Sequence, residues 1–227
     1  MLYIVATPIG NLDDLSIRQA EILSQSDVIL AEDTRSAYIL LDAIAKRFNH
    51  YANRQHRIIS YYKEKEFEKL PEVMDALRGG KTVSLISESG MPLICDPGSL
   101  LIKQVIKEHI PFTVIPGPSA ATTALVLSGF STEQFMFVGF LPKKKSALVR
   151  LINQWKHIKE IFPNMSMVFF ESPNRIRESL RVLDDLFPNI QIAICREMTK
   201  KFEEVIRGAA SELMKREYKG ELTVIVG

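Results

Sequence analysis

The stretch "SLISESGMPLICDPGS" at residues 84–99 decides the fold, because it joins an apolar strand to a rigid turn. Its first residues belong to the run "TVSLIS" at 82–87, and two glycines and two prolines follow. A short apolar run of this kind is typical of a strand covered on both faces, as in a parallel sheet. Proline restricts φ, and glycine permits positive φ or a close approach of the backbone. The turn after this strand should therefore be stiff and preformed.

Similar apolar runs recur through the first half of the chain and alternate with amphipathic stretches. The predicted strands are 2–6, 28–31, 58–60, 82–87 and 112–115. The stretches between them have apolar residues at helical spacing, and one ends at Gly79-Gly80, a helix stop signal. Strands that alternate with helices predict βαβ units and a doubly wound parallel sheet.

The second half has a different order of predicted strands and helices. Strands are predicted at 135–140, 165–171, 190–195, 203–208 and 221–227, and helices at 146–160, 173–186 and 209–216. The strands at 190–195 and 203–208 are too close in sequence for a helical crossover, so they should pair antiparallel. We therefore predict two α/β domains, 1–130 with a parallel sheet and 131–227 with a mixed sheet.

The composition is that of a globular protein, with 46% apolar and 25% charged residues. The longest apolar runs are far shorter than the roughly 18 residues of a membrane span, and the first residues, "MLYIVATPIG", lack the basic flank of a signal peptide. We therefore expect a cytoplasmic protein. A net charge of +2 is too small to identify a nucleic-acid binder, but it does not exclude one.

The cysteines and histidines do not indicate a metal site. Cys95 and Cys195 are far apart and have no CxxC spacing, so we expect both to be core residues without a disulfide. The four histidines share no metal-ligand spacing with one another or with the cysteines: they are His50, His56, His109 and His157. A metal enzyme is therefore disfavoured.

Three strand ends in the first half lead into loops of one style, "VATPIGN" (5–11), "LISESGMPLICDPG" (85–98) and "VIPGPSAA" (114–121). Ligands of open parallel sheets bind outside the carboxyl ends of the strands. We therefore expect the three loops to meet at one edge and to form a stiff rim. Each could also be an ordinary turn between a strand and a helix.

The rim lacks the usual signals for a phosphate ligand. No GxGxxG follows the first strand, and no GxxxxGK[ST] occurs in the chain. A small adenosine-bearing molecule with a cationic centre suits such a rim better than a polyphosphate.

Several motifs along the whole chain resemble those of a known superfamily. They are "LYIVATPIGNLDDLSIRQAEIL", "AEDTR", "LISESGMPLICDPG", "IPGPSAATTAL", "GFLPKK", "VFFESPNRI", "REMTKKFEEVIRG" and "GELTVIVG". In this order they resemble the tetrapyrrole methylase superfamily, and most of all its branch of ribosomal RNA small-subunit methyltransferase I, which 2′-O-methylates a cytidine. The resemblance implies S-adenosylmethionine as the cofactor, ribosomal RNA or the small ribosomal subunit as partner, and a homodimer.

The resemblance also implies which residues contact the cofactor. Carried over motif by motif, they are Pro8, Ser89, Gly90, Met91, Ile94, Ser119, Ala120, Glu171, Met198 and Thr199. This chain departs from the branch at "SESGMP", where typical members read SDAGTP. Glu88 thus replaces an aspartate and Met91 replaces a threonine, which changes the lining of the expected cofactor site.

Candidate catalytic groups lie in "AEDTR", just after a predicted strand. A ribose hydroxyl is a weak nucleophile and benefits from a positioned base, and Glu32, Asp33 and Arg35 could face the substrate. Asp33 could equally be the N-cap of the following helix, and Glu32 and Arg35 could form an ion pair. Glu88 and Asp96 flank the cofactor loop and could also take the proton or hold a ribose hydroxyl, so the base stays open.

Two basic stretches could contact RNA. The predicted RNA-binding residues are Lys143, Lys144, Lys145, Arg175 and Lys200. They could also be a solvated helix start and a solvated hairpin. Two other functions stay open: a methyltransferase of a tetrapyrrole or another small molecule, and a non-catalytic protein that binds the cofactor or RNA.

Overall fold

The five apolar runs of the first half form one parallel sheet, as predicted. The computed structural model describes residues 1–48 and 56–227. Its first strands are β1 (Leu2–Val5), β2 (Val28–Ala31), β3 (Arg57–Ser60), β4 (Val83–Ile86) and β5 (Phe112–Ile115). The order β3-β2-β4-β1-β5 places β4 at the centre of the sheet. Because neighbouring strands are parallel, all five carboxyl ends lie at the same edge.

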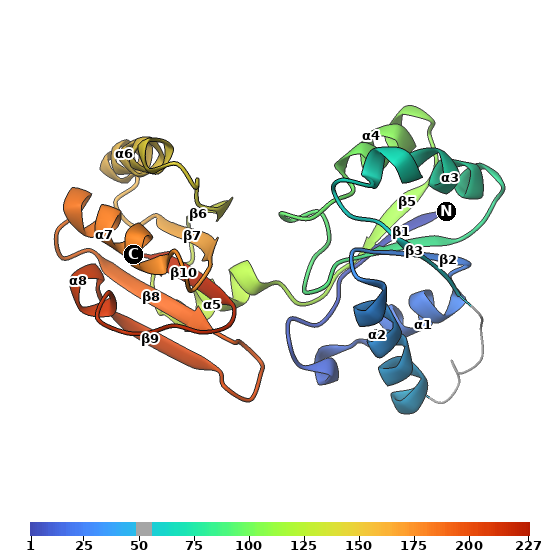
Figure 1. Ribbon diagram of the computed structural model, residues 1–227, viewed down its shortest axis with the longest axis horizontal. Helices are drawn as coiled ribbons and strands as arrows, with labels where there is room; N and C mark the ends of the chain where they lie inside the picture. Colours follow the sequence, from blue (N-terminus) through green and yellow to red (C-terminus); the bar gives the residue numbers. More distant parts are fainter. Residues whose placement is uncertain (49–55) are drawn as a thin grey trace. The chain divides into compact units, whose positions relative to one another are not determined.

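Helices cover both faces of this sheet (Figure 1). Helices α1 (Ile17–Gln25) and α2 (Thr34–Arg47) pack on one face, and α3 (Glu66–Arg78) and α4 (Ser99–Lys107) pack on the other. A short 3-10 helix, η1 (Leu12–Asp14), precedes α1. Neighbours β1 and β4 are followed by helices on opposite faces, so a switch point of the doubly wound sheet lies between them.

The second half forms a mixed five-stranded sheet, as predicted. Its strands are β6 (Phe135–Phe140), β7 (Ser166–Glu171), β8 (Gln191–Arg196), β9 (Glu204–Ala209) and β10 (Leu222–Val226), in the order β6-β7-β10-β8-β9. Strands β6 and β7 are parallel, and the other neighbours are antiparallel. The β8–β9 hairpin confirms the antiparallel pairing expected from the short connection.

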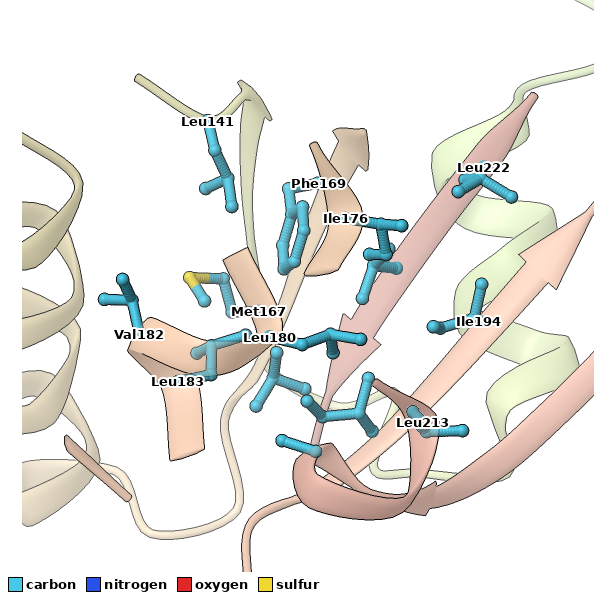
Figure 2. Close-up of a cluster of buried hydrophobic side chains, with 14 of the residues drawn as sticks. Leu141, Met167, Phe169, Ile176, Leu180, Val182, Leu183, Ile194, Leu213 and Leu222 are labelled. Atoms are coloured by element: carbon cyan, nitrogen blue, oxygen red, sulfur yellow. The ribbon is translucent and has the colours of Figure 1, made fainter. Parts of the chain in front are cut away.

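The main core of the second half lies between this sheet and the helices α6 (Lys145–Ile161), α7 (Ile176–Leu186) and α8 (Ala210–Leu213). Figure 2 shows Leu141, Met167 and Phe169 pointing into this cluster together with side chains of α7. Helix α5 (Ala120–Ser128) packs on the opposite face of the sheet. There the Cys195 thiol lies 3.7 Å from the Ala124 carbonyl oxygen, whereas the neighbouring Ile194 faces the main core.

The chain divides into two units, Met1–Ser119 and Ala120–Gly227. The predicted division at residue 130 is therefore too late, because α5 packs against β10, β8, β7 and β9 and belongs to the second unit. Its small residues Ala121 and Ala124 are buried there. No low-complexity linker marks this join, so the sequence contains no local signal for it.

The two cysteines differ in their surroundings. Cys195 is buried, as predicted, but Cys95 is exposed, so the expectation that it is a core residue is wrong. Cys95 lies in the long loop after β4 and has a φ of 72°, the left-handed region. Among the described residues, no helix has both the length and the apolar character needed to cross a membrane.

Candidate functional site at the carboxyl edge of the first sheet

The three loops predicted to form a rim converge at Gly90. The Thr7 amide donates to the Gly90 carbonyl oxygen at 2.8 Å, which joins the loop after β1 to the loop after β4. A Cβ atom added at Gly90 would lie 3.1 Å from Cγ2 of Ile9 and 3.5 Å from the carbonyl oxygen of Pro118, in the loop after β5. Gly90 has a φ of 83°, which favours glycine. The expectation that the loops meet at one edge is confirmed.

Buried hydroxyls hold this junction together. The Ser87 hydroxyl donates to the Gly90 carbonyl oxygen at 2.9 Å, and the Thr7 hydroxyl donates to the Ser87 carbonyl oxygen at 3.2 Å. Thr7 and Ser87 are both buried. These hydrogen bonds preorganise the turn at Gly90.

The predicted cofactor residues of the first unit lie around this junction. Pro8 and Gly90 are buried, Met91 and Ser119 are half-buried, and Ser89 and Ile94 are exposed. The rim thus combines a rigid backbone with a few accessible side chains.

Carboxylates line the neighbouring part of the same edge. Glu32 follows β2, whereas Glu88 and Asp96 lie in the loop after β4. Partial burial and the charges of Glu32 and Glu88 raise the pKa of Asp96 to about 6. Partial burial, then Glu88 and Glu64, also raise the pKa of Glu32. The electrostatic coupling of these groups shows that the ends of β2 and β4 share one acidic surface.

Asp33 and Arg35 form a local pair at the start of α2. The Arg35 amide donates to Oδ1 of Asp33 at 2.8 Å, so Asp33 is the N-cap of this helix. The Arg35 guanidinium donates to both carboxylate oxygens and holds the pKa of Asp33 down at about 2. The alternative of a capping role for Asp33 is therefore observed. The expected alternative of a Glu32–Arg35 ion pair is wrong, because Arg35 pairs with Asp33.

Glu171, a predicted cofactor contact, is buried at the end of β7 in the second unit. Its Oε2 accepts a hydrogen bond from the Ser179 hydroxyl at 2.7 Å, and its Oε1 accepts one from the Ser172 amide at 2.8 Å. The Arg175 guanidinium lies 3.6 Å from Oε1 and donates to the carbonyl oxygens of Leu141 and Pro142 at 3.1 and 2.9 Å. These contacts explain the positions of Glu171 and Arg175 without a ligand, and their predicted binding roles stay predictions.

The other predicted residues of the second unit lie at separate places within it. Ala120 begins α5, and Met198 is buried in the turn between β8 and β9. Thr199 follows Met198 with a φ of 64°, and its amide donates to the Glu203 carboxylate at 2.6 Å. Their roles toward the cofactor stay predictions.

The predicted RNA-binding lysines fall into two groups. Lys200 lies 3.3 Å from the Glu197 carboxylate and 2.7 Å from that of Glu221, so its charge is largely balanced within the protein. Lys143, Lys144 and Lys145 are exposed at the start of α6. The second group is better placed to meet an anionic partner.

Sequence reasoning missed one buried carboxylate that supports the site. Glu66 of α3 accepts hydrogen bonds from the amides of Leu100 and Leu101 at 2.7 and 3.4 Å, and thereby caps α4. Helix α4 begins directly after Gly98, which provides no side-chain cap. A glycine at this N-cap was the one signal that another part of the chain must supply the acceptor.

No cluster of three or more His, Cys, Asp or Glu side chains that could hold a metal ion is found within residues 1–48 and 56–227. His50, one of the histidines considered above, lies outside the described residues.

Comparison with known proteins places the chain in a family. The family of tetrapyrrole (corrin/porphyrin) methylases matches residues 1–214. The chain belongs to this family. The predicted family and methyltransferase class are therefore confirmed.

Curated relatives within the methylase family match nearly the whole chain. The ribosomal RNA small subunit methyltransferase I of Hydrogenobaculum sp. is 42% identical over 99% of this chain and 94% of the relative. The protein of the same name from Thermotoga maritima is 39% identical over 99% of this chain and 97% of the relative. The one from Halalkalibacterium halodurans is 38% identical over 99% of this chain and 75% of its own length.

Solved structures of methylases have the same fold. The methyltransferase CobJ matches with a TM-score of 0.71 at 17% identity, over 100% of this chain and 93% of that one. The uroporphyrin-III C-methyltransferase of Thermus thermophilus, solved in complex with S-adenosylhomocysteine, matches with a TM-score of 0.67 at 14% identity, over 100% and 96%. At these identities the likeness concerns the fold, and it confirms the predicted architecture of two α/β sheets.

Proposed function

We propose that this chain is an S-adenosylmethionine-dependent methyltransferase that modifies the ribose 2′-hydroxyl of a cytidine in small-subunit ribosomal RNA. The observation that carries the proposal is the convergence of three proline- and glycine-containing loops at Gly90, in a chain of the methylase family. Relatives that are 38–42% identical over nearly the full chain, and that are named for small-subunit ribosomal RNA, support the choice of substrate.

The chemistry of the rim fits this methyl donor. Residues 7–10, 87–98 and 116–119 contain no lysine or arginine, but they include Glu88 and Asp96. Such a rim repels polyphosphates and favours a ligand with a positive centre, such as a sulfonium. We assign the contacts to Pro8, Ser89–Met91, Ile94 and Ser119, and the preformed junction at Gly90 lowers the entropic cost of binding.

The residues of this edge suit the demands of methyl transfer. The bound donor supplies an electrophilic methyl group, and the main task of the protein is to hold donor and acceptor in line. Glu32 is the best-placed base among the predicted catalytic residues, because partial burial, and then the carboxylates around it, raise its pKa and its affinity for a proton. Asp33 and Arg35 hold the start of α2 and position the chain directly after Glu32. A positioned base contributes roughly 10²–10⁴ in rate.

Transfer of labelled methyl groups tests the proposal. The protein is incubated with radiolabelled S-adenosylmethionine and small ribosomal subunits from cells that lack this gene. We expect label in 2′-O-methylcytidine after digestion of the RNA. Label in a porphyrinoid supplied in a parallel reaction would indicate a small-molecule methyltransferase, and donor binding without transfer to either acceptor would indicate a non-catalytic protein. Either result would overturn the proposal.

A pair of variants tests the role of Glu32. Glu32→Gln should lower kcat by about 10²-fold or more, the contribution of a positioned base, and should leave the donor Kd from calorimetry within about twofold of wild type. Glu21→Gln, at an exposed position of α1, is the matched control and should retain kcat. An unchanged kcat in Glu32→Gln would remove this residue from the mechanism.

The proposal includes a cytoplasmic location, where small ribosomal subunits are found, and a homodimer, which the family motifs suggest. Light scattering after gel filtration should give twice the chain mass of 25.7 kDa. A mass of a single chain at micromolar concentration would refute the dimer.

A further inference from the structure

A β-bulge in strand β6 turns one phenylalanine away from the core. The register of β6 against β7 shifts between Phe137 and Phe140, and Gly139 between them has a φ of 65°. Met136 and Val138 pack against the main core of the second unit. Regular alternation would send Phe140 to that same face. The bulge instead brings Phe140 beside Phe170, a frequent use of bulges at sheet edges and functional sites.

The next residue takes the core position that Phe140 leaves. Leu141 is buried in the main core, where Figure 2 shows it with Met167 and Phe169. The chain thus places an aliphatic side chain inside and keeps the larger aromatic one outside. Phe140 is 60% exposed, so the hydrophobic effect within this unit does not account for its position.

Phe140 extends a row of aromatic rings across β6 and β7. The ring centroid of Phe170 lies 5.0 Å from that of Phe137 and 5.5 Å from that of Phe140, with interplanar angles of 68° and 61°. The edge-to-face contact with Phe170 holds the Phe140 ring beside β7. Because β6 is the edge strand of its sheet, this ring is presented at the edge.

Three exposed lysines follow within five residues of Phe140. Lys143, Lys144 and Lys145 have no carboxylate ion-pair partner in the described part of the chain. The turn that joins them to Phe140 is held by the Arg175 guanidinium, which binds the carbonyl oxygens of Leu141 and Pro142. Arg175 is in turn held beside the buried Glu171. An aromatic ring and a cluster of positive charges are thus kept at a defined spacing.

We propose that Phe140 stacks on an unpaired base of the substrate RNA while Lys143–Lys145 contact the phosphates beside that base. The inference rests on the proposed function and adds to it the recognition of a single-stranded segment. Base stacking on aromatic side chains and lysine contacts to phosphates are the usual means of binding unpaired RNA. The positive charge of the lysine cluster favours RNA over a second copy of this chain as the occupant. Arg175 is a positioning residue for this surface.

Replacing the ring while keeping an apolar side chain tests the stacking. Phe140→Leu should raise the Kd for small ribosomal subunits that lack the methyl group by at least about fivefold, the lower end for loss of one base–aromatic stack. Phe140→Trp should keep wild-type affinity, because it retains a flat ring. Phe162→Leu is the matched control at another exposed phenylalanine of this unit and should leave the Kd unchanged. Donor affinity and Tm should stay at wild-type values in all three variants.

The salt dependence of binding tests the lysines. Changing Lys143, Lys144 and Lys145 together to glutamine should lower the slope of log Kd against log salt concentration by up to about 2, since each phosphate contact on a single strand contributes about 0.7. A variant with glutamine at the exposed Lys156, Lys215 and Lys219 has the same change in net charge and should keep the wild-type slope.

The outcomes separate this inference from the proposed function. If the wild type methylates subunits but Phe140→Leu binds them equally well, the stacking surface is wrong and the enzyme assignment stands. If the wild type binds subunits through Phe140 but transfers no methyl group, the stacking surface stands and the enzyme assignment is wrong. A change in oligomeric state in Phe140→Leu would assign the ring to a contact between protein copies and would overturn the inference.

Discussion

Single carboxylates at the acidic edge of the first sheet make the stability of the protein depend on pH. Asp96 is partly buried and lies near Glu32 and Glu88, so its ionised form is disfavoured and its pKa is raised from the usual 3.8 to about 6. Between these two values the folded state binds more protons than the unfolded state. By linkage, Asp96 makes the free energy of unfolding decrease as pH rises from about 4 to about 6.

Replacement of Asp96 should therefore stabilise the protein at neutral pH. Asp96→Asn should raise the free energy of unfolding at pH 7.5 by about 1 kcal/mol, after allowance for solvent screening of a partly exposed group. The gain should disappear at pH 4, where the wild-type side chain is protonated in the folded state. Urea unfolding at both pH values measures the difference, with the exposed Asp185→Asn as control. An equal gain at both pH values would contradict the assigned cause.

Gly98 shows how closely the backbone approaches the core beneath the long loop. It has a φ of 119°, and an added Cβ would lie 2.6 Å from Cδ2 of Leu93 and 2.7 Å from Cδ2 of Leu85. Gly98→Ala should lower the free energy of unfolding by about 3 kcal/mol, because backbone strain and overpacking add.

A second glycine separates these two causes. Gly80 has a φ of 78° but nothing within 4 Å of an added Cβ. Gly80→Ala should therefore cost only about 1 kcal/mol, from the backbone alone. Chemical denaturation of both variants measures the difference, and equal losses would show that packing at Gly98 is unimportant.

At the level of elements, the site depends on a helix that receives its cap from another helix. Helix α4 follows the long loop directly, and its first free amides are bound by Glu66 of α3. A carboxylate at a helix N-terminus also interacts favourably with the helix dipole. The cap from Glu66 thus joins α4, where the long loop after β4 ends, to α3 on the same face of the first sheet.

Loss of this cap should be measurable as lost stability. Glu66→Ala should lower the free energy of unfolding by about 2 kcal/mol, since it removes a buried acceptor from two amides. Glu66→Gln keeps an acceptor oxygen and should cost about half as much. Glu68→Ala, on the exposed side of the same helix, should stay within about 0.5 kcal/mol of wild type. Equal effects at positions 66 and 68 in urea unfolding would exclude the capping role.

The elements that sequence predicted best are those specified by local patterns. The apolar run 28–31 coincides with β2, and the run 135–140 coincides with β6. The bulge at Gly139 and the cap from Glu66 were not predicted, because each depends on a partner that is distant in sequence. The rim loops were predictable because proline restricts φ wherever it occurs and glycine permits the positive φ that tight turns need.

For the molecule as a whole, the division into two units is the feature that sequence predicted least well. Helix α5 follows β5 like the helices of the first unit, so its position in the chain suggests that it belongs there. Its small and apolar residues, including Ala124 and Leu125, are instead buried against the second sheet. The assignment of a helix to a sheet is decided by packing, and a periodic pattern does not indicate which sheet it will meet.

Fragments of the second unit test this division. A fragment 120–227 should unfold cooperatively, because it retains both layers over its sheet. A fragment 131–227 lacks α5 and exposes the face that contains Val168 and Cys195, so it should bind ANS and lose near-ultraviolet circular dichroism. The two fragments are compared at equal concentration. Cooperative unfolding of the shorter one would restore the boundary near residue 130.

The contact between Thr7 and Gly90 is made by main-chain atoms, an amide and a carbonyl oxygen. Its geometry therefore depends on the number of residues between Ile86 and Gly90, and on the Ser87 hydroxyl that donates to the same carbonyl oxygen. A mutational library of this segment, scored for folded protein and not for donor binding, should tolerate many replacements at exposed positions such as Ser89, yet reject the insertion or deletion of one residue. Related chains can then differ in the exposed residues of this loop and act on other methyl-acceptor substrates, provided that the loop keeps its length.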